Sequence, residues 1–172
     1  LGRSMTNLAG KRMLLTGASQ GLGAVCAPYF ASQGAKLVLM ARNKEKLELV
    51  RSQCYNPEHH VSVAVDLTDL DALYSALASA KEFLGGIDIV LHCAGGGLGL
   101  RDPLLSADDF EKLIKLNLKQ VLEINRLVVP EMMQRKQGNL VHVCSIASSE
   151  ATGSVGYNTA KATLAAYVRS LG

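Results

Sequence analysis

Five short apolar runs alternate with helical patterns along the 172-residue chain, and this alternation constrains the fold more than any other feature. The runs are apolar throughout rather than at every second position, which is typical of parallel strands buried on both faces. Strands of this kind, joined by helices through right-handed crossovers, form a doubly wound sheet. The sequence therefore predicts an α/β fold with about five parallel strands and helices on both faces.

The predicted elements follow one another without a linker or an internal repeat. We expect strands at residues 11–16, 35–41, 60–65, 87–93 and 138–145, and helices at 24–33, 44–53, 69–83, 108–135 and from 157 to the end. Asn43, Thr68 and Ser106 or Ala107 stand where helix caps are expected. Residues 11–172 are therefore predicted to form a single domain, and residues 1–10 are predicted to be a flexible N-terminal segment.

The composition excludes several classes of protein. Hydrophobic residues make up 48% of the chain and charged residues 19%, which indicates a globular domain. The net charge is only +3 and no basic block occurs, so nucleic acid is not an expected partner. No run of 18 apolar residues is present, so no membrane span is expected. The cysteines form no C-x-x-C pair and have no histidine at metal spacing, which predicts reduced thiols, no metal site and a cytoplasmic protein; they are Cys26, Cys54, Cys93 and Cys144.

A glycine-rich turn joins the first predicted strand to the first predicted helix. Gly17, Gly21 and Gly23 stand where backbone N–H groups and the helix N-terminus can face a pyrophosphate. Their spacing is G-x-x-x-G-x-G rather than the commoner G-x-G-x-x-G, and such a turn alone is as often purely structural. Its place at the start of a strand–helix–strand unit favours a dinucleotide site on a Rossmann-type sheet.

The ends of the second and third strands bear on the choice of cofactor. Arg42 follows the second strand, and neither it nor Ala41 is an acid that would hold the ribose 2′-hydroxyl of NAD. This favours NADP over NAD; the less favoured alternative is that Arg42 is a solvated loop residue. Asp66 ends the third strand, where it could bond the adenine amine or cap the following turn.

A tyrosine and a lysine near the end of the chain suggest acid–base chemistry. Tyr157 and Lys161 are four residues apart and share one face of a helix, and Ser145 precedes Tyr157 by twelve residues. A lysine ammonium beside a phenol favours the phenolate, and a serine hydroxyl can hold a carbonyl oxygen. Such a set moves a proton to or from an alcohol or ketone oxygen. Tyr-x-x-x-Lys alone also occurs on ordinary helix surfaces.

Taken together, these motifs resemble the short-chain dehydrogenase/reductase family over residues 11–172. Residues 16–23 match its T-G-x-x-x-G-x-G, Asp66 and Leu67 match its adenine-binding acid, and residues 92–95 resemble its N-N-A-G. Asn117, Ser145, Tyr157 and Lys161 stand at the spacing of its catalytic set. The resemblance implies that the cofactor is held by Gly17, Ser19, Gln20, Gly21, Leu22, Gly23, Arg42, Asp66, Leu67, Ala94, Gly95, Tyr157 and Lys161.

The resemblance also implies a role for each catalytic residue. Tyr157 would be the general acid/base, and Lys161 would assist it and hold the nicotinamide ribose. Ser145 would orient the substrate oxygen, and Asn117 would support a water near Lys161. The reaction would be hydride transfer between NADP and a small-molecule carbonyl compound or secondary alcohol. Without the resemblance, Asn117 would be interpreted as a surface position of an amphipathic helix.

Two departures from the family pattern leave a second hypothesis open. His92 and Cys93 replace the two asparagines of N-N-A-G, and we expect His92 to be structural. Family members also usually continue beyond the helix that contains Tyr157, so we expect that the C-terminal part, with its substrate lid, is absent here. The alternative is therefore a non-catalytic module that binds NADP or a partner.

The sequence says less about partners and substrate. Apolar positions on the two helices where the family usually pairs subunits are compatible with a homodimer or homotetramer; they are Ile114, Leu118, Leu122, Leu164, Tyr167 and Val168. Residues 95–105 and 146–156 are expected to line the mouth of the site. They are small and apolar, which would tolerate a hydrophobic carbonyl compound.

Overall fold

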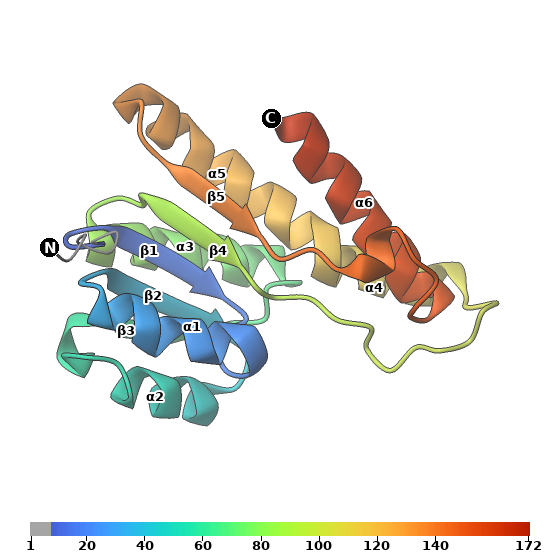
Figure 1. Ribbon diagram of the computed structural model, residues 1–172, viewed down its shortest axis with the longest axis horizontal. Coiled ribbons are helices and arrows are strands. Elements are labelled where there is room, and N and C mark those ends of the chain that lie inside the picture. Colours follow the sequence, from blue (N-terminus) through green and yellow to red (C-terminus); the bar gives the residue numbers. More distant parts are fainter. Residues whose placement is uncertain (1–7) are drawn as a thin grey trace, which may run out of the picture.

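The computed structural model describes residues 8–172, and within them five parallel strands form one sheet (Figure 1). The strand order is β3-β2-β1-β4-β5, which is the predicted Rossmann-type arrangement. The strands are β1 (Arg12–Thr16), β2 (Lys36–Ala41), β3 (Val61–Ala64), β4 (Ile89–His92) and β5 (Asn139–His142). Because β1 has β2 on one side and β4 on the other, the chain reverses direction across the sheet at β1, and ligands bind at such switch points.

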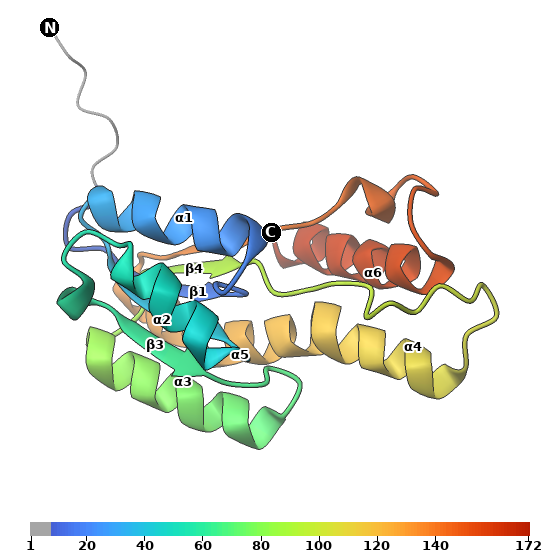
Figure 2. The same ribbon diagram turned by 90° about the horizontal axis from the view of Figure 1, so that it is seen from below.

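Helices cover both faces of this sheet, as predicted (Figure 2). Helices α1 (Gly21–Ser32) and α2 (Lys44–Ser52) lie on one face, and α3 (Leu70–Leu84) and α5 (Gln120–Arg135) lie on the other. Helices α4 (Ala107–Ile114) and α6 (Val155–Leu171) pack against each other beyond the carboxyl end of the sheet. Single turns of 3₁₀-helix occur at η1 (Pro57–His59) and η3 (Ile146–Ser148).

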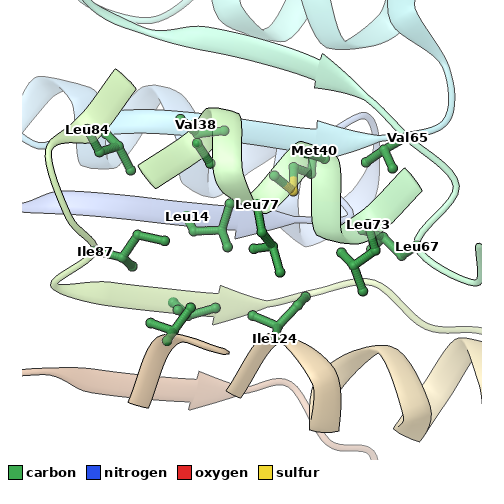
Figure 3. Packing of buried hydrophobic residues seen from close by; sticks show 14 of the residues in the cluster. Leu14, Val38, Met40, Val65, Leu67, Leu73, Leu77, Leu84, Ile87 and Ile124 are labelled. Atoms are coloured by element: carbon green, nitrogen blue, oxygen red, sulfur yellow. The ribbon is translucent and has the colours of Figure 1, made fainter. Parts of the chain in front are cut away.

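Each face of the sheet has its own hydrophobic core. Leu15, Leu37 and Leu39 face α1 and α2, where Leu47 is also buried. On the other face, a larger cluster fills the space under α3 and α5 (Figure 3); it includes Leu14, Val38, Met40, Leu73, Leu77, Leu84, Ile87 and Ile124. Burying one such side chain contributes about 1.5–3 kcal/mol. The central strands are therefore stabilised by packing on both faces, and the loops at their carboxyl ends are held in place by this packed sheet.

Helix boundaries follow their caps and differ by a few residues from those predicted. Asp69, not Thr68, caps α3, because its Oδ1 accepts a hydrogen bond from Ala72 N at 3.1 Å. Helix α6 begins two residues earlier than predicted, because Ser154 caps it through Tyr157 N. Asn43 and Ser106 cap α2 and α4 as expected.

The long helix predicted over residues 108–135 contains an irregularity that the sequence did not reveal. A π-turn, η2 (Lys115–Lys119), separates α4 from α5. A π-turn widens the helix by one residue, and such turns occur frequently at functional sites. This one contains Asn117, which is completely buried.

The N-terminal segment is described only in part. Residues 1–7 of the segment predicted to be flexible lie outside the described residues. The N–H groups of Leu8 and Gly10 donate to the carbonyls of Gln33 and Gly34 at 3.0 and 3.2 Å. Over residues 8–172, no helix is both long and apolar enough to cross a membrane.

Candidate active site

A cavity of about 850 Å³ opens at the carboxyl ends of β1, β2 and β3. It is lined by the glycine-rich turn, by the residues that follow β2 and β3, and by the start of the loop after β4. It brings together eleven of the predicted cofactor-binding residues: Gly17, Ser19, Gln20, Gly21, Leu22, Gly23, Arg42, Asp66, Leu67, Ala94 and Gly95. Tyr157 and Lys161 lie outside this lining.

The glycine-rich turn is packed too closely for side chains at two positions. A Cβ on Gly23 would lie 2.4 Å from the carbonyl oxygen of Gly17. Gly17 itself has φ +64°, and a Cβ there would lie 2.6 Å from Ala94 N. The first turn of α1 contains no acid, and Gln20 makes no side-chain cap bond to it. Its free N–H groups are therefore available to an anion, as a pyrophosphate requires.

The charges around this cavity favour a polyanion. Four cations line it, whereas Asp66 is the one acid among the residues of its lining: the cations are Arg42, Lys46, Lys112 and Lys115. Lys112 pairs with Asp109 at 2.7 Å, and Lys115 pairs with Glu111 at 3.2 Å. Arg42 and Lys46 form no salt bridge with any residue from 8 to 172. Their charges are thus left for a ligand.

Asp66 caps the turn that follows β3. Its Oδ1 accepts hydrogen bonds from the backbone N and the hydroxyl of Thr68, at 2.9 and 2.7 Å. These bonds, with a smaller contribution from the charge of Arg42, lower the pKa of Asp66. Of the two roles left open by the sequence, the structural one is therefore present. Asp66 also lines the cavity, so a contact with adenine remains a prediction.

Asn117 fastens the loop that follows β4. Its Oδ1 accepts from Gly96 N at 3.0 Å, and its Nδ2 donates to the carbonyls of Gly96 and Leu113, each at 2.9 Å. A Cβ on Gly95 would lie 2.8 Å from Asn117 Oδ1 and 3.0 Å from Lys161 Nζ. Asn117 and Lys161 thus converge on Gly95, and the interpretation of Asn117 as a surface position is wrong.

Tyr157 and Lys161 occupy successive turns of α6. The Nζ of Lys161 lies 5.9 Å from the centre of the Tyr157 ring and donates to the carbonyl of Val143 at 3.3 Å. Lys161 is only 5% exposed, and this burial lowers its pKa. The helix therefore holds a nearly buried cation beside a phenol, as the four-residue spacing predicts.

Ser145 lies on the loop beside this pair. Its Oγ accepts from Ala147 N at 3.1 Å and so caps η3, which packs against α6. Ser145 is outside the lining of the larger cavity and of a second one, over Tyr157, that is described next. Within residues 8–172, no hydrogen bond joins it to Tyr157.

A second cavity, of about 530 Å³, lies over Tyr157. The loop after β4 forms one wall with Gly97, Gly99, Leu100 and Arg101. The other wall consists of Thr152, Gly153 and Ser154, which lead into α6, and of Tyr157 on its first turn. The expectation of a small and apolar mouth is wrong in one respect, because Arg101 is charged. Sequence reasoning missed Arg101 and Lys46. Lys46 could have been found, because it lies in the first turn of α2, four residues after Arg42.

A buried polar network connects α6 to the sheet behind the site. The imidazole of His92 bonds through Nε2 to Asn125 Oδ1 at 2.8 Å, and Asn125 Nδ2 lies 3.0 Å from both His142 Nε2 and the Tyr167 hydroxyl. The two imidazoles stack 4.7 Å apart. Burial, and secondarily the charge of His142, lowers the pKa of His92 to about 3. His92 therefore has a packing role here. No cluster of metal-ligating residues is present over residues 8–172.

Comparison with known proteins gives consistent matches. A family model described as short chain dehydrogenase matches residues 11–172. An uncharacterized oxidoreductase from Staphylococcus aureus (strain USA300) is 33% identical over 150 residues, which cover 87% of this chain and 64% of that protein. Gluconate 5-dehydrogenase from Gluconobacter oxydans is 35% identical over 157 residues, which cover 90% of this chain and 60% of that protein. The chain thus spans less than two thirds of the length of either relative.

Solved structures give the same result. A short-chain dehydrogenase/reductase of unknown function from Caenorhabditis elegans, solved with cofactor, has a TM-score of 0.88 at 30% identity, covering 96% of this chain and 64% of that one. A 3-ketoacyl-(acyl-carrier-protein) reductase from Brucella melitensis, complexed with NADH, has a TM-score of 0.85 at 25% identity, covering 95% of this chain and 69% of that one.

Proposed function

Because the chain belongs to the short-chain dehydrogenase family, we propose that this protein is an NADP-dependent oxidoreductase that interconverts a carbonyl compound and a secondary alcohol. The observation that carries this proposal is the convergence of Asn117 and Lys161 on Gly95, one helical turn from Tyr157. A buried lysine, a phenol and a fixed glycine loop meet between two cavities. One cavity suits a dinucleotide, and the other suits a small substrate.

In the proposed reduction, the Tyr157 hydroxyl donates a proton to the carbonyl oxygen of the substrate. The ammonium of Lys161 then stabilises the phenolate that remains, because it lies close to the ring and is poorly hydrated. Ser145 orients the carbonyl oxygen, and Asn117 holds the loop and a water that returns the proton. The nicotinamide, when bound, supplies the hydride.

We assign the adenosine end of the cofactor to the larger cavity. The open N–H groups of α1 would bind the pyrophosphate, and Asp66 would bond the adenine. Arg42 and Lys46, the two unpaired cations of the lining, would bind the 2′-phosphate. The Brucella relative was solved with NADH, so the preference for NADP is supported by the charges of this chain alone.

Replacing Arg42 tests the cofactor preference. We expect Arg42→Asp to weaken NADPH binding by about tenfold or more and to improve NADH binding, because a carboxylate repels a phosphate and accepts from a ribose hydroxyl. Lys46→Gln should weaken only NADPH binding. Lys44→Gln, which changes an exposed lysine outside the lining, is the matched control. Isothermal titration calorimetry measures these affinities, and equal binding of NADH and NADPH by the unmodified protein would refute the preference.

Turnover separates the enzyme from the non-catalytic alternative. The natural protein should oxidise NADPH in the presence of at least one member of a panel of aldehydes and ketones. Tight NADPH binding without turnover of any member would favour the binding module instead.

A homodimer or homotetramer in the cytoplasm remains part of this proposal, and analytical ultracentrifugation tests the assembly.

A further inference from the structure

The cavity over Tyr157 has an unusual charge for a space lined mostly by glycine and small residues. Arg101 is the one charged side chain among the residues that line it. Its remaining polar side chains are the hydroxyls of Thr152, Ser154 and Tyr157, and no carboxylate is present in the lining. The cavity therefore has a net positive charge.

Arg101 has no partner that would explain its position. It forms no salt bridge and no side-chain hydrogen bond with any of residues 8–172. Asp102, the nearest acid in sequence, is also exposed, and its Oδ1 accepts from Leu104 N at 2.8 Å. The Arg101 side chain is exposed and lines the cavity. The guanidinium is thus available to a ligand.

The loop that contains Arg101 packs against α6, the helix that contains Tyr157. The carbonyl of Gly97 accepts from Leu100 N at 2.9 Å and closes a tight turn, in which Leu98 and Gly99 have φ of +52° and +73°. A Cβ on Gly97 would lie 3.7 Å from Tyr157 Cβ. In Figures 1 and 2, the loop between β4 and α4 runs past the N-terminal end of α6. Arg101 therefore follows a turn that rests on the tyrosine.

We propose that the substrate carries a carboxylate, and that Arg101 binds it while the carbonyl or hydroxyl group lies at Tyr157. This inference rests on the proposed function and adds the substrate class, an oxo acid or hydroxy acid. A carboxylate is preferred to a phosphate because the single positive charge of Arg101 balances one carboxylate, whereas a phosphate monoester carries about −1.5 to −2 charge at pH 7. A cavity of about 530 Å³ accommodates a small acid of this kind.

Matched pairs of substrates test the charge directly. The natural protein is assayed with NADPH on straight-chain oxo acids of increasing length, each compared with its primary amide, which has nearly the same shape and no charge. We expect kcat/KM to be about tenfold or more higher for the best acid than for its amide, mainly through KM. The preference should weaken at high salt, because an exposed ion pair is screened.

Three variants assign this preference to Arg101. Arg101→Gln should remove most of the preference and leave kcat/KM for the amide within about twofold, whereas Arg101→Lys should retain part of it. Arg169→Gln is the matched control, since this exposed arginine lies on α6 about 18 Å along the helix from Tyr157. Equal rates for acid and amide in the natural protein, or equal losses for both in Arg101→Gln, would overturn the proposal.

A binding measurement distinguishes failure of this inference from failure of the proposed function. If the acids, the amides and the panel of aldehydes and ketones all show no turnover, the proposed function is wrong, and calorimetry with the same acids on the NADP-loaded protein tests whether a carboxylate binds at Arg101. Acid binding that is lost in Arg101→Gln supports the carboxylate site. Acid binding that is absent, or unchanged in that variant, overturns it.

Discussion

Asn117 shows how one side chain connects the loop after β4 to helix α4. Its three hydrogen bonds fix Gly96 on the loop and Leu113 on α4. Asn117 is completely buried, so bulk water cannot replace a partner that its amide loses. A buried polar group that loses its partner costs about 1–3 kcal/mol. The loop between the two cavities therefore depends on this single amide.

Replacement of Asn117 should be costly for this reason. We expect Asn117→Leu, which keeps the side-chain size, to lower the free energy of unfolding by about 3 kcal/mol. Urea denaturation measures the change. Asn139→Ala, at an exposed position of β5, is the control and should change the free energy by less than about 0.5 kcal/mol. Similar losses in the two variants would show that the amide does not hold the loop.

Some site residues could be identified from the sequence, and others could not. The Tyr157–Lys161 pair was predictable because a helix places residues four apart on one face. The burial of Asn117 was not, because it depends on a contact with Gly96, 21 positions earlier in the chain. Arg101 was missed as well, since the shape of its loop depends on positive φ at Leu98, a residue type that rarely adopts it.

At the scale of elements, the glycine-rich turn between β1 and α1 separates two reasons for using glycine. Gly23 faces the carbonyl of Gly17 at a distance that no Cβ can occupy. Gly21 has φ +56° but open space around it. Glycine is therefore required at position 23 by packing, and at position 21 by backbone conformation alone.

Alanine substitutions should distinguish these reasons. We expect Gly21→Ala to cost about 1–2 kcal/mol of unfolding free energy, the strain of a left-handed residue. Gly23→Ala should cost more and should also abolish NADPH binding, because the turn must move. Urea denaturation and calorimetry measure both properties. Retained NADPH affinity in Gly23→Ala would contradict this account of the turn.

The histidine network between β4, β5, α5 and α6 predicts a dependence of stability on pH. His92 donates through Nε2 to Asn125, whereas its buried Nδ1 has no partner among residues 8–172. A second proton on this ring would have no acceptor, which is consistent with a folded-state pKa of about 3. In the unfolded chain the pKa is about 6.5. Below pH 6.5 the unfolded state thus binds more protons, and stability falls as the pH falls.

The expected size of this loss is measurable. Between pH 7 and pH 5, His92 alone should lower the free energy of unfolding by about 2 kcal/mol. His92→Gln keeps a donor toward Asn125 and should remove that part of the loss. His59→Gln, an exposed histidine, is the control. If urea denaturation at both pH values gives the same loss with and without His92, the network does not have this role.

Element boundaries show the limits of local patterns. The strands were predictable because their apolar runs are continuous and the helices between them carry caps such as Asn43. The π-turn was not, because the apolar pattern of α4 continues into α5 across it. Asp69 and Thr68 both suit a cap; in the structure Asp69 accepts from Ala72 N, whereas the Thr68 hydroxyl donates to Asp66.

For the molecule as a whole, the order of strands and helices determines the fold, and the larger cavity lies at the carboxyl ends of the strands beside the switch point. The proposed chemistry follows from the residues that line the two cavities. The proposed function requires that the dinucleotide cavity and the cavity over Tyr157 act together, with Tyr157 as the proton donor between them.

The most direct test of this claim is turnover by Tyr157→Phe with NADPH and the best carbonyl substrate. We expect NADPH binding to stay within about twofold, because the ring is kept, and the rate to fall by at least about a hundredfold, because the proton donor is lost. Tyr55→Phe, at an exposed position, should leave both unchanged. An undiminished rate in Tyr157→Phe would contradict the proposed mechanism.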